Sequence, residues 1–269
     1  MRILRWSSMW LYALIIVVPV LFVVESSFKN LATLYENPLW PSQGLTVSSY
    51  QTLISQVPLG RYFLNSFVVT SVTLVMVLAF GTMVGYAVLR LPKLPAAIVY
   101  GGFSLGMMIP TQVNMIPSYL EMNQLHMVDT LYGLILVESA FLMPVVVFIV
   151  GGFMRTLAKE LIEAATVDGA NEWQVFWHMA LPLSAPSIAS AAIFGGVIVW
   201  NDLLFPLLLI KTNNNRTLPL ALLSFTGQYQ TNYPVIFAGV LLASIPMVIL
   251  FVFLQKYFMA GMTAGAVKG

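Results

Sequence analysis

Charged residues are scarce in this sequence. Asp, Glu, Lys and Arg make up 8% of its 269 residues, whereas a globular domain carries roughly 25% charged residues. A water-soluble fold with so few charges would expose large apolar patches and aggregate. Hydrophobic residues make up 59% of the chain, and lipid is the solvent in which such a composition is stable. We therefore predict an integral membrane protein.

Other absences exclude several kinds of catalytic or cofactor site. The sequence has no cysteine, so it forms neither disulfides nor thiolate metal sites. It also has no Gly-x-x-x-x-Gly-Lys-Ser/Thr loop for binding ATP. Its two histidines, His126 and His178, fall on opposite sides of the membrane in the topology derived below, so they cannot form one metal site. We therefore predict no enzyme activity, no catalytic residue, no bound metal or cofactor and no nucleic-acid partner, so any energy from ATP must come through another protein.

Apolar segments of roughly 20 residues, the length that crosses a bilayer, account for most of the chain. We place six spans, at about residues 9–28, 64–89, 95–120, 131–153, 186–210 and 234–257. Pro110 and Pro117 are expected to kink the third span without ending it. The first span resembles a signal peptide but lacks a small-x-small cleavage pattern, so an uncleaved helix is expected. The predicted fold class is an all-α membrane protein, a single transmembrane domain over residues 1–269.

The positions of the cationic residues predict the orientation of this domain. If the N-terminus is cytoplasmic, eight cations lie inside and four outside, the bias found in membrane proteins. The inner set is Arg2, Arg5, Arg90, Lys93, Arg155, Lys159, Lys256 and Lys268. The outer set is Lys29, Arg61, Lys211 and Arg216. Both termini, the loop 155–182 between the fourth and fifth spans and the tail 258–269 are therefore predicted to be cytoplasmic.

The loop 155–182 has more internal pattern than a simple connector. Apolar residues recur at helical spacing before Asp168-Gly169, a turn signal at which Gly169 can take a positive φ. Asn171 and Gln174 approximate a capping box that opens a second short helix. The pattern predicts a helix–turn–helix under the membrane. Periodicity alone leaves two interpretations open, a docking element for another protein or an amphipathic segment that caps the bundle.

The same loop resembles a known family motif, Glu-Ala-Ala-x3-Gly-x9-Ile-x-Leu-Pro. The matching residues are Glu163, Ala164, Ala165, Gly169, Leu181 and Pro182. Only Met179 departs, an apolar replacement at the Ile position. This motif, called the EAA motif, marks the permease subunits of binding-protein-dependent ABC importers. The sequence therefore resembles that family.

The resemblance extends over most of the chain and implies partners and sites. Gly85-Tyr86-Ala87, Trp200-Asn201-Asp202 and Leu218-Pro219 are similar to the sugar-type branch, and residues 261–269 resemble the tail of its maltose-type second permease. In that family the loop is a coupling helix seated in the ATPase subunit, and the tail reaches the ATPase as well. The implied ATPase-docking residues are Glu163, Ala164, Ala165, Asp168, Gly169, Pro182, Gly265 and Lys268.

The resemblance also implies the assembly and its cargo. The chain is expected in the inner (plasma) membrane of a bacterium or archaeon, paired with a second homologous permease and two ATPase subunits that use ATP and Mg. An extracytoplasmic solute-binding protein would deliver a sugar or oligosaccharide. Another solute, such as glycerol phosphate, is the main alternative. The composition leaves no room for a soluble catalytic domain, and surrounding lipid is the remaining partner.

Polar residues inside the predicted spans are the candidates for the substrate path. Glu138 and Asp202 are ionisable within apolar segments, where such groups are costly and often functional, and Asn201 adjoins Asp202. Asp202 has an alternative role as a hydrogen-bonding group at a helix end, and Glu138 suits a structural role. An ion-driven carrier would be a rival use for these acids. The absence of intramembrane Lys or Arg and of an inverted repeat argues against it.

Overall fold

A computed structural model of the chain describes residues 2–39, 45–227 and 231–266, and most of them are helical. The only pairing of extended backbone within these ranges is an isolated bridge between Thr226 and Thr231. The chain falls into two compact units, Met1–Phe63 with Thr217–Pro246 and Leu64–Arg216 with Met247–Gly269. The predicted all-α class is confirmed. The prediction of one domain over residues 1–269 stays a prediction.

The first unit packs short helices against one end of a long one. It contains α1 (Arg2–Ser27), α2 (Leu31–Glu36), α3 (Ser48–Gln56), α13 (Leu218–Leu222), η4 (Leu223–Phe225) and the first part of α14 (Tyr233–Ala266). Asn30 caps α2 by accepting the N–H of Thr33 at 2.8 Å. Leu53 of α3, Phe225 of η4 and Val235 of α14 form a buried core. Apolar side chains along α1 are exposed, as lipid-facing residues are.

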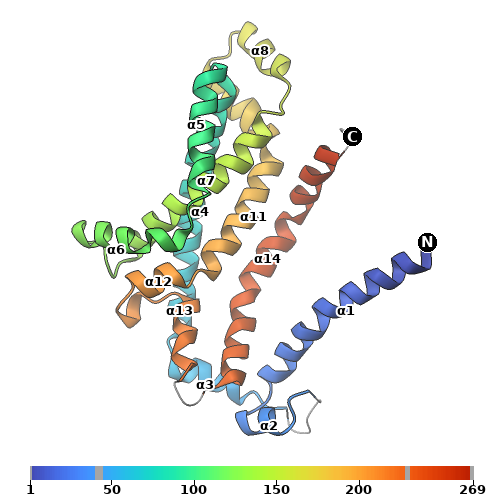
Figure 1. The fold of residues 1–269 in the computed structure, drawn as a ribbon, viewed down its shortest axis with the longest axis vertical. Coiled ribbons are helices and arrows are strands. Elements are labelled where there is room, and N and C mark those ends of the chain that lie inside the picture. Colours follow the sequence, from blue (N-terminus) through green and yellow to red (C-terminus); the bar gives the residue numbers. More distant parts are fainter. Residues whose placement is uncertain (1, 40–44, 228–230, 267–269) are drawn as a thin grey trace. The chain divides into compact units, whose positions relative to one another are not determined.

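The second unit is a bundle around α7 (Leu131–Met154). α5 (Lys93–Gly106) and α11 (Ala185–Asn201) pack against α7. A Cβ at Gly85 of α4 (Leu59–Arg90) would lie 3.2 Å from the Cα of Gly151, so α4 and α7 approach closely through glycines. α8 (Lys159–Val167) lies at the end where α4 ends and α5 begins, whereas α6 (Met115–Gln124) and α12 (Leu204–Leu209) lie toward the other end (Figure 1).

The predicted third span, 95–120, is not one kinked helix. α5 ends at Gly106, and the chain resumes as η1 (Thr111–Asn114) and α6 after a bend of 85°. Pro110 precedes η1 with no N–H to donate, and it disfavours helical backbone at Ile109. The proline that was expected to kink the helix therefore separates two helices.

The ends of the last two predicted spans also differ. The fifth was placed at 186–210, but α11 ends at Asn201 because the carboxylate of Asp202 accepts the N–H groups of the following turn and starts α12. The sixth was ended at 257, but α14 remains helical to Ala266. The last three residues of the predicted tail, 267–269, lie outside the described residues.

The number of spans depends on how the bends are counted. Within the described part of the chain, four helices are long and apolar enough to cross a membrane, and there are six spans if each bent pair counts as one. The bent pairs are Lys93–Gly106 with Thr111–Gln124, and Glu172–Leu183 with Ala185–Asn201. The predicted count of about six corresponds to the second way of counting.

Candidate functional site: the loop between α7 and α11

The first helix of the loop, α8, exposes most of the predicted docking motif. Glu163 and Ala164 are exposed and Ala165 is half-buried, whereas Ile162 on the opposite face is buried. Val167, one helical turn after Ala164, is 87% exposed, which is unusual for a valine outside lipid. Sequence reasoning did not single out Val167. Its spacing from Ala164 was the available signal, and the two together make an exposed apolar edge.

The turn after α8 is fixed by backbone hydrogen bonds. Asp168 donates its N–H to Ala164 at 2.9 Å and Ala170 donates to Ala165 at 3.0 Å, so the last carbonyls of the helix are satisfied. Gly169 has φ of +89°, a conformation that glycine adopts without strain. The predicted turn at Asp168-Gly169 is therefore present, and the motif glycine has a physical reason.

The second helix of the loop begins at the predicted capping box. Gln174 donates its N–H to the side chain of Asn171 at 3.0 Å, and the side chain of Gln174 accepts the N–H of Asn171 at 2.9 Å. α9 (Glu172–Val175) then continues through a π-helical turn, η2 (Phe176–Ala180), and α10 (Leu181–Leu183) into α11. Pro182 occupies the first turn of α10 and is exposed. From Glu172 onward the loop is therefore helical up to its junction with α11.

The aromatic residues of α9 and η2 do not all face one side. Phe176 is buried, and its ring centroid lies 5.4 Å from that of Tyr86 on α4. Trp173 and Trp177 pack edge-to-face on Phe176 at 6.0 and 5.4 Å but remain more than half exposed. Both tryptophan rings contact that of Phe176, but of the three only Phe176 is buried. A single ring, that of Phe176, anchors the loop to the bundle.

Glu172 ties the loop to the end of α4. It accepts hydrogen bonds from the hydroxyl of Tyr86 at 2.5 Å and from the Nε and Nη2 of Arg90 at 3.1 and 2.5 Å. The two Arg90 bonds go to different carboxylate oxygens, the bidentate arrangement that fixes orientation best. Sequence reasoning did not predict this contact, because the partners lie 82 and 86 positions apart.

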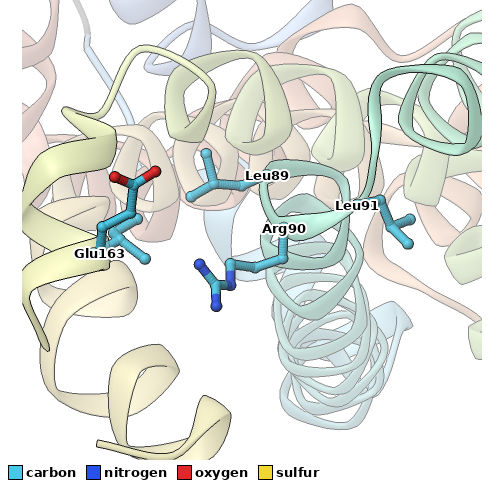
Figure 2. Close-up of a pocket in the computed structure, with 5 residues that line it drawn as sticks. Leu89, Arg90, Leu91 and Glu163 are labelled. Carbon is cyan, nitrogen blue, oxygen red and sulfur yellow. The ribbon is translucent and has the colours of Figure 1, made fainter. Parts of the chain in front are cut away.

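Two hollows adjoin the motif. One, of about 160 Å³, is lined by Leu89, Arg90, Leu91, Ile162 and Glu163. Leu89 and Arg90 point toward the helix that carries Glu163, and Leu91 points away (Figure 2). The other, of about 380 Å³, is lined by Asp168, Gly169, Ala170, Gln174, Val175, His178 and Met179. Residues of the motif therefore line recesses that a partner's side chains could fill.

The three predicted substrate-path residues occupy the middle and far end of the second unit. Glu138 is buried in α7 near Asp202, and its Oε1 has no hydrogen-bond partner among the described residues. Asp202 accepts the N–H of Phe205 at 3.0 Å, the helix-end role weighed as its alternative. Asn201 donates to the carbonyl of Val197 at 2.8 Å. Their place on a substrate path stays a prediction.

A polar cluster at that far end was not predicted. One carboxylate oxygen of Asp129, in the turn before α7, accepts the N–H groups of Lys211 and Thr212 at 2.9 Å each and the Thr212 hydroxyl at 3.1 Å. Asn65 of α4 donates to the carbonyls of Asn214 and Arg216 at 2.9 Å. The segment 211–216 is thus held by side chains from two other parts of the chain.

Two predicted docking residues lie at the end of the chain. Gly265 is part of α14, and Lys268 lies outside the described residues. The prediction that the tail contacts an ATPase therefore stays untested. Among the residues that the structure describes, no three His, Asp or Glu side chains gather in a way that could hold a metal ion.

Comparisons with known sequences agree on one family. The profile described as "Binding-protein-dependent transport system inner membrane component" matches residues 77–264. The chain is 34% identical to an arabinooligosaccharides transport system permease protein of Halalkalibacterium halodurans, over 96% of this chain and 93% of that protein. It is also 31% identical to a melibiose/raffinose/stachyose import permease protein of Bacillus subtilis, over 100% of both chains.

Solved structures with the same fold come from a bacterial ABC transporter for the acidic polysaccharide alginate. One superposes with a TM-score of 0.79 at 20% identity, covering 95% of each chain. Another, with an alginate pentasaccharide-bound periplasmic protein in the complex, gives 0.67 at 13% identity, covering 93% of this chain and 94% of that one. At such low identity the likeness speaks for the fold alone, and that fold extends over nearly the whole chain.

Proposed function

Because this chain belongs to the family of binding-protein-dependent transport system inner membrane components, we propose that it forms half of the membrane path of an ABC importer for a sugar or oligosaccharide. Relatives at 31–34% identity are named for arabinooligosaccharides and for melibiose, raffinose and stachyose. The other half of the path would come from a second, homologous permease. An external binding protein would deliver the sugar.

The observation that carries the proposal is the geometry of the loop α8–α9. The motif residues Glu163 and Ala164 are exposed on a short helix that ends in a fixed turn. Because alanine side chains are small, another protein can approach the backbone of this face closely. The loop is joined directly to α7 and continues into α11. We assign it as the docking element for a separate ATPase, with Ala165, Asp168, Gly169 and Pro182 completing the face.

This assignment accounts for how a chain without an ATP-binding loop can be driven by ATP. When two ATPase subunits close on ATP and Mg, the docking helix α8, seated in one of them, would move with them as a rigid body. The helices joined to it change position, and the membrane path alternates between its two openings. The loop, both termini and the tail with Gly265 and Lys268 lie on the cytoplasmic side in this proposal. The whole chain acts as one transmembrane domain with no cofactor of its own.

Placing a charge on the docking face tests the proposal. In the Ala164→Asp variant an unpaired carboxylate would be buried at the ATPase interface, which costs several kcal/mol. ATP-driven sugar uptake by the reconstituted complex should therefore fall about tenfold or more, and less ATPase should co-purify. Because Ala164 is exposed, the amount of variant in the membrane should not change.

The matched control is Ala32→Asp, which places the same charge on an exposed alanine of α2 in a predicted outer connection. It should retain uptake and the bound ATPase. Normal uptake by Ala164→Asp, or wild-type chain that purifies without an ATPase and takes up solute on an ion gradient alone, would count against the proposed function.

A further inference from the structure

The loop 155–182 is joined covalently to α7 and α11, but it is also fastened to α4, a helix more than 60 positions earlier in the chain. The fastening consists of Tyr86 and Arg90, both in the last turn or so of α4, and Glu172 at the start of α9. Three hydrogen bonds converge on one carboxylate, two of them from the cationic guanidinium of Arg90. We call these three residues the α4 clamp.

Packing reinforces the α4 clamp on its inner side. The ring of Tyr86 packs against that of Phe176, and both residues are less than a tenth exposed. Tyr86 thus contacts the loop twice, through its ring and through its hydroxyl. An apolar contact alone would let the loop slide over α4, whereas bidentate bonding to Arg90 also fixes direction. The arrangement suits the transmission of a displacement.

Arg90 also faces the docking helix. Its guanidinium shares with Glu163 the cavity of about 160 Å³ between α4 and α8 (Figure 2). The charge of Glu163 acts on Arg90 across that space, while Glu172 binds Arg90 directly. One cation at the end of α4 therefore lies beside both helices of the loop.

We propose that Tyr86, Arg90 and Glu172 are positioning residues that couple movement of the loop α8–α9 to α4. The inference rests on the proposed function, because it takes the loop as the element that an ATPase moves. The α4 clamp adds α4 to the helices that follow the loop, and α4 in turn packs on α7 through Gly85 and Gly151. Displacement of the loop then moves α4 and α7 together, rather than bending the connector.

The test uses the complete complex of this chain, its partner permease and its ATPase in proteoliposomes, with the binding protein added outside. The variants are Tyr86→Phe, which removes one hydroxyl, and Glu172→Gln, which removes the charge. Tyr86 is less than a tenth exposed and lies outside the docking face, so co-purification of the ATPase with Tyr86→Phe separates a coupling effect from a docking effect. Controls are Tyr132→Phe and Glu121→Gln, which change exposed residues at the far end of the same unit.

The expected result is uncoupling with assembly intact. Both clamp variants should bind the ATPase and hydrolyse ATP at the basal rate, but sugar uptake per ATP should fall about fivefold to tenfold, the size of a typical coupling energy. The single variant Glu172→Arg should also lose coupling. The double variant Arg90→Glu with Glu172→Arg, which reverses the ion pair, should regain at least half of the coupling that this single variant loses. The controls should behave as the wild type.

Two outcomes would overturn the inference. One is unchanged uptake per ATP in both clamp variants. The other is a loss of uptake that parallels loss of the bound ATPase or of thermal stability, which would make the α4 clamp a structural support only. Failure of the proposed function looks different, because the wild-type chain itself would then lack a bound ATPase.

Discussion

At the scale of single residues, the acids show what sequence can and cannot reveal. The turn at Asp168-Gly169 and the box of Asn171 with Gln174 were predicted, because their partners lie within a few positions and local rules apply. Glu172 and Asp129 were not, because each accepts hydrogen bonds from residues more than 80 positions away. No periodicity encodes such pairings.

Asp129 provides a residue-scale prediction. Partial burial raises its pKa, but the hydrogen bonds from Thr212, Lys211 and Asn215 together outweigh this and lower the pKa below the usual 3.8. A lowered pKa means that the bonding stabilises the fold above that pH and is lost only as the pH falls through the lower value. At neutral pH the cluster is therefore intact.

Replacing Asp129 by Val should release the segment 211–216. The N–H groups of Lys211 and Thr212 lose a charged acceptor, and hydrogen bonds to charged groups contribute about 1.5–3 kcal/mol. Valine also tolerates the positive φ of 62° at this position poorly. Trypsin added to the purified protein at pH 8 should cleave after Lys211 or Arg216 several times faster. Asp129→Asn, which keeps an acceptor and tolerates positive φ, should change the rate little, and equal rates for both variants would contradict the account.

At the scale of helices, sequence predicted existence and type better than ends. The predicted spans at 64–89, 131–153 and 234–257 correspond to the single helices α4, α7 and α14. The runs at 95–120 and 186–210 were misjudged, since they were placed by apolar character while Pro110 and Asp202 set the helix ends through backbone hydrogen bonding. Within α4, Gly81 and Gly85 approach α7 closely.

The glycine contact between α4 and α7 makes an element-scale prediction. A Cβ at Gly85 would lie 3.2 Å from Gly151 Cα and 3.3 Å from its N, and this backbone cannot rotate away. Gly85→Val should therefore separate the helices and cost about 1–3 kcal/mol, lowering the thermal unfolding midpoint of the purified protein. Gly101→Val is the matched control, since nothing lies within 4 Å of a Cβ at Gly101. Equal midpoints for the two variants would argue against close packing there.

At the scale of the whole molecule, the family was predictable from some twenty residues of one loop, whereas the substrate was not. The motif specifies a helix face with small side chains followed by a turn at a glycine. The structure contains this turn. In the proposed function, the substrate path would depend on side chains from several helices and from a partner permease. Asp202 accepts a hydrogen bond from the backbone of this chain, and Glu138 is buried near it. The sequence therefore predicts a docking loop more sharply than it predicts the cargo.

The central claim, that the loop α8–α9 docks a separate ATPase, can be tested by cross-linking. Because the sequence has no cysteine, single cysteines can be placed at Ala164 in α8 and at Tyr132, an exposed residue at the far end of the same unit. Both can be labelled with a cysteine-directed photo-cross-linker in the assembled complex. The account predicts that Ala164→Cys cross-links to the ATPase and Tyr132→Cys does not. Cross-linking of the ATPase from Tyr132→Cys but not from Ala164→Cys would contradict it.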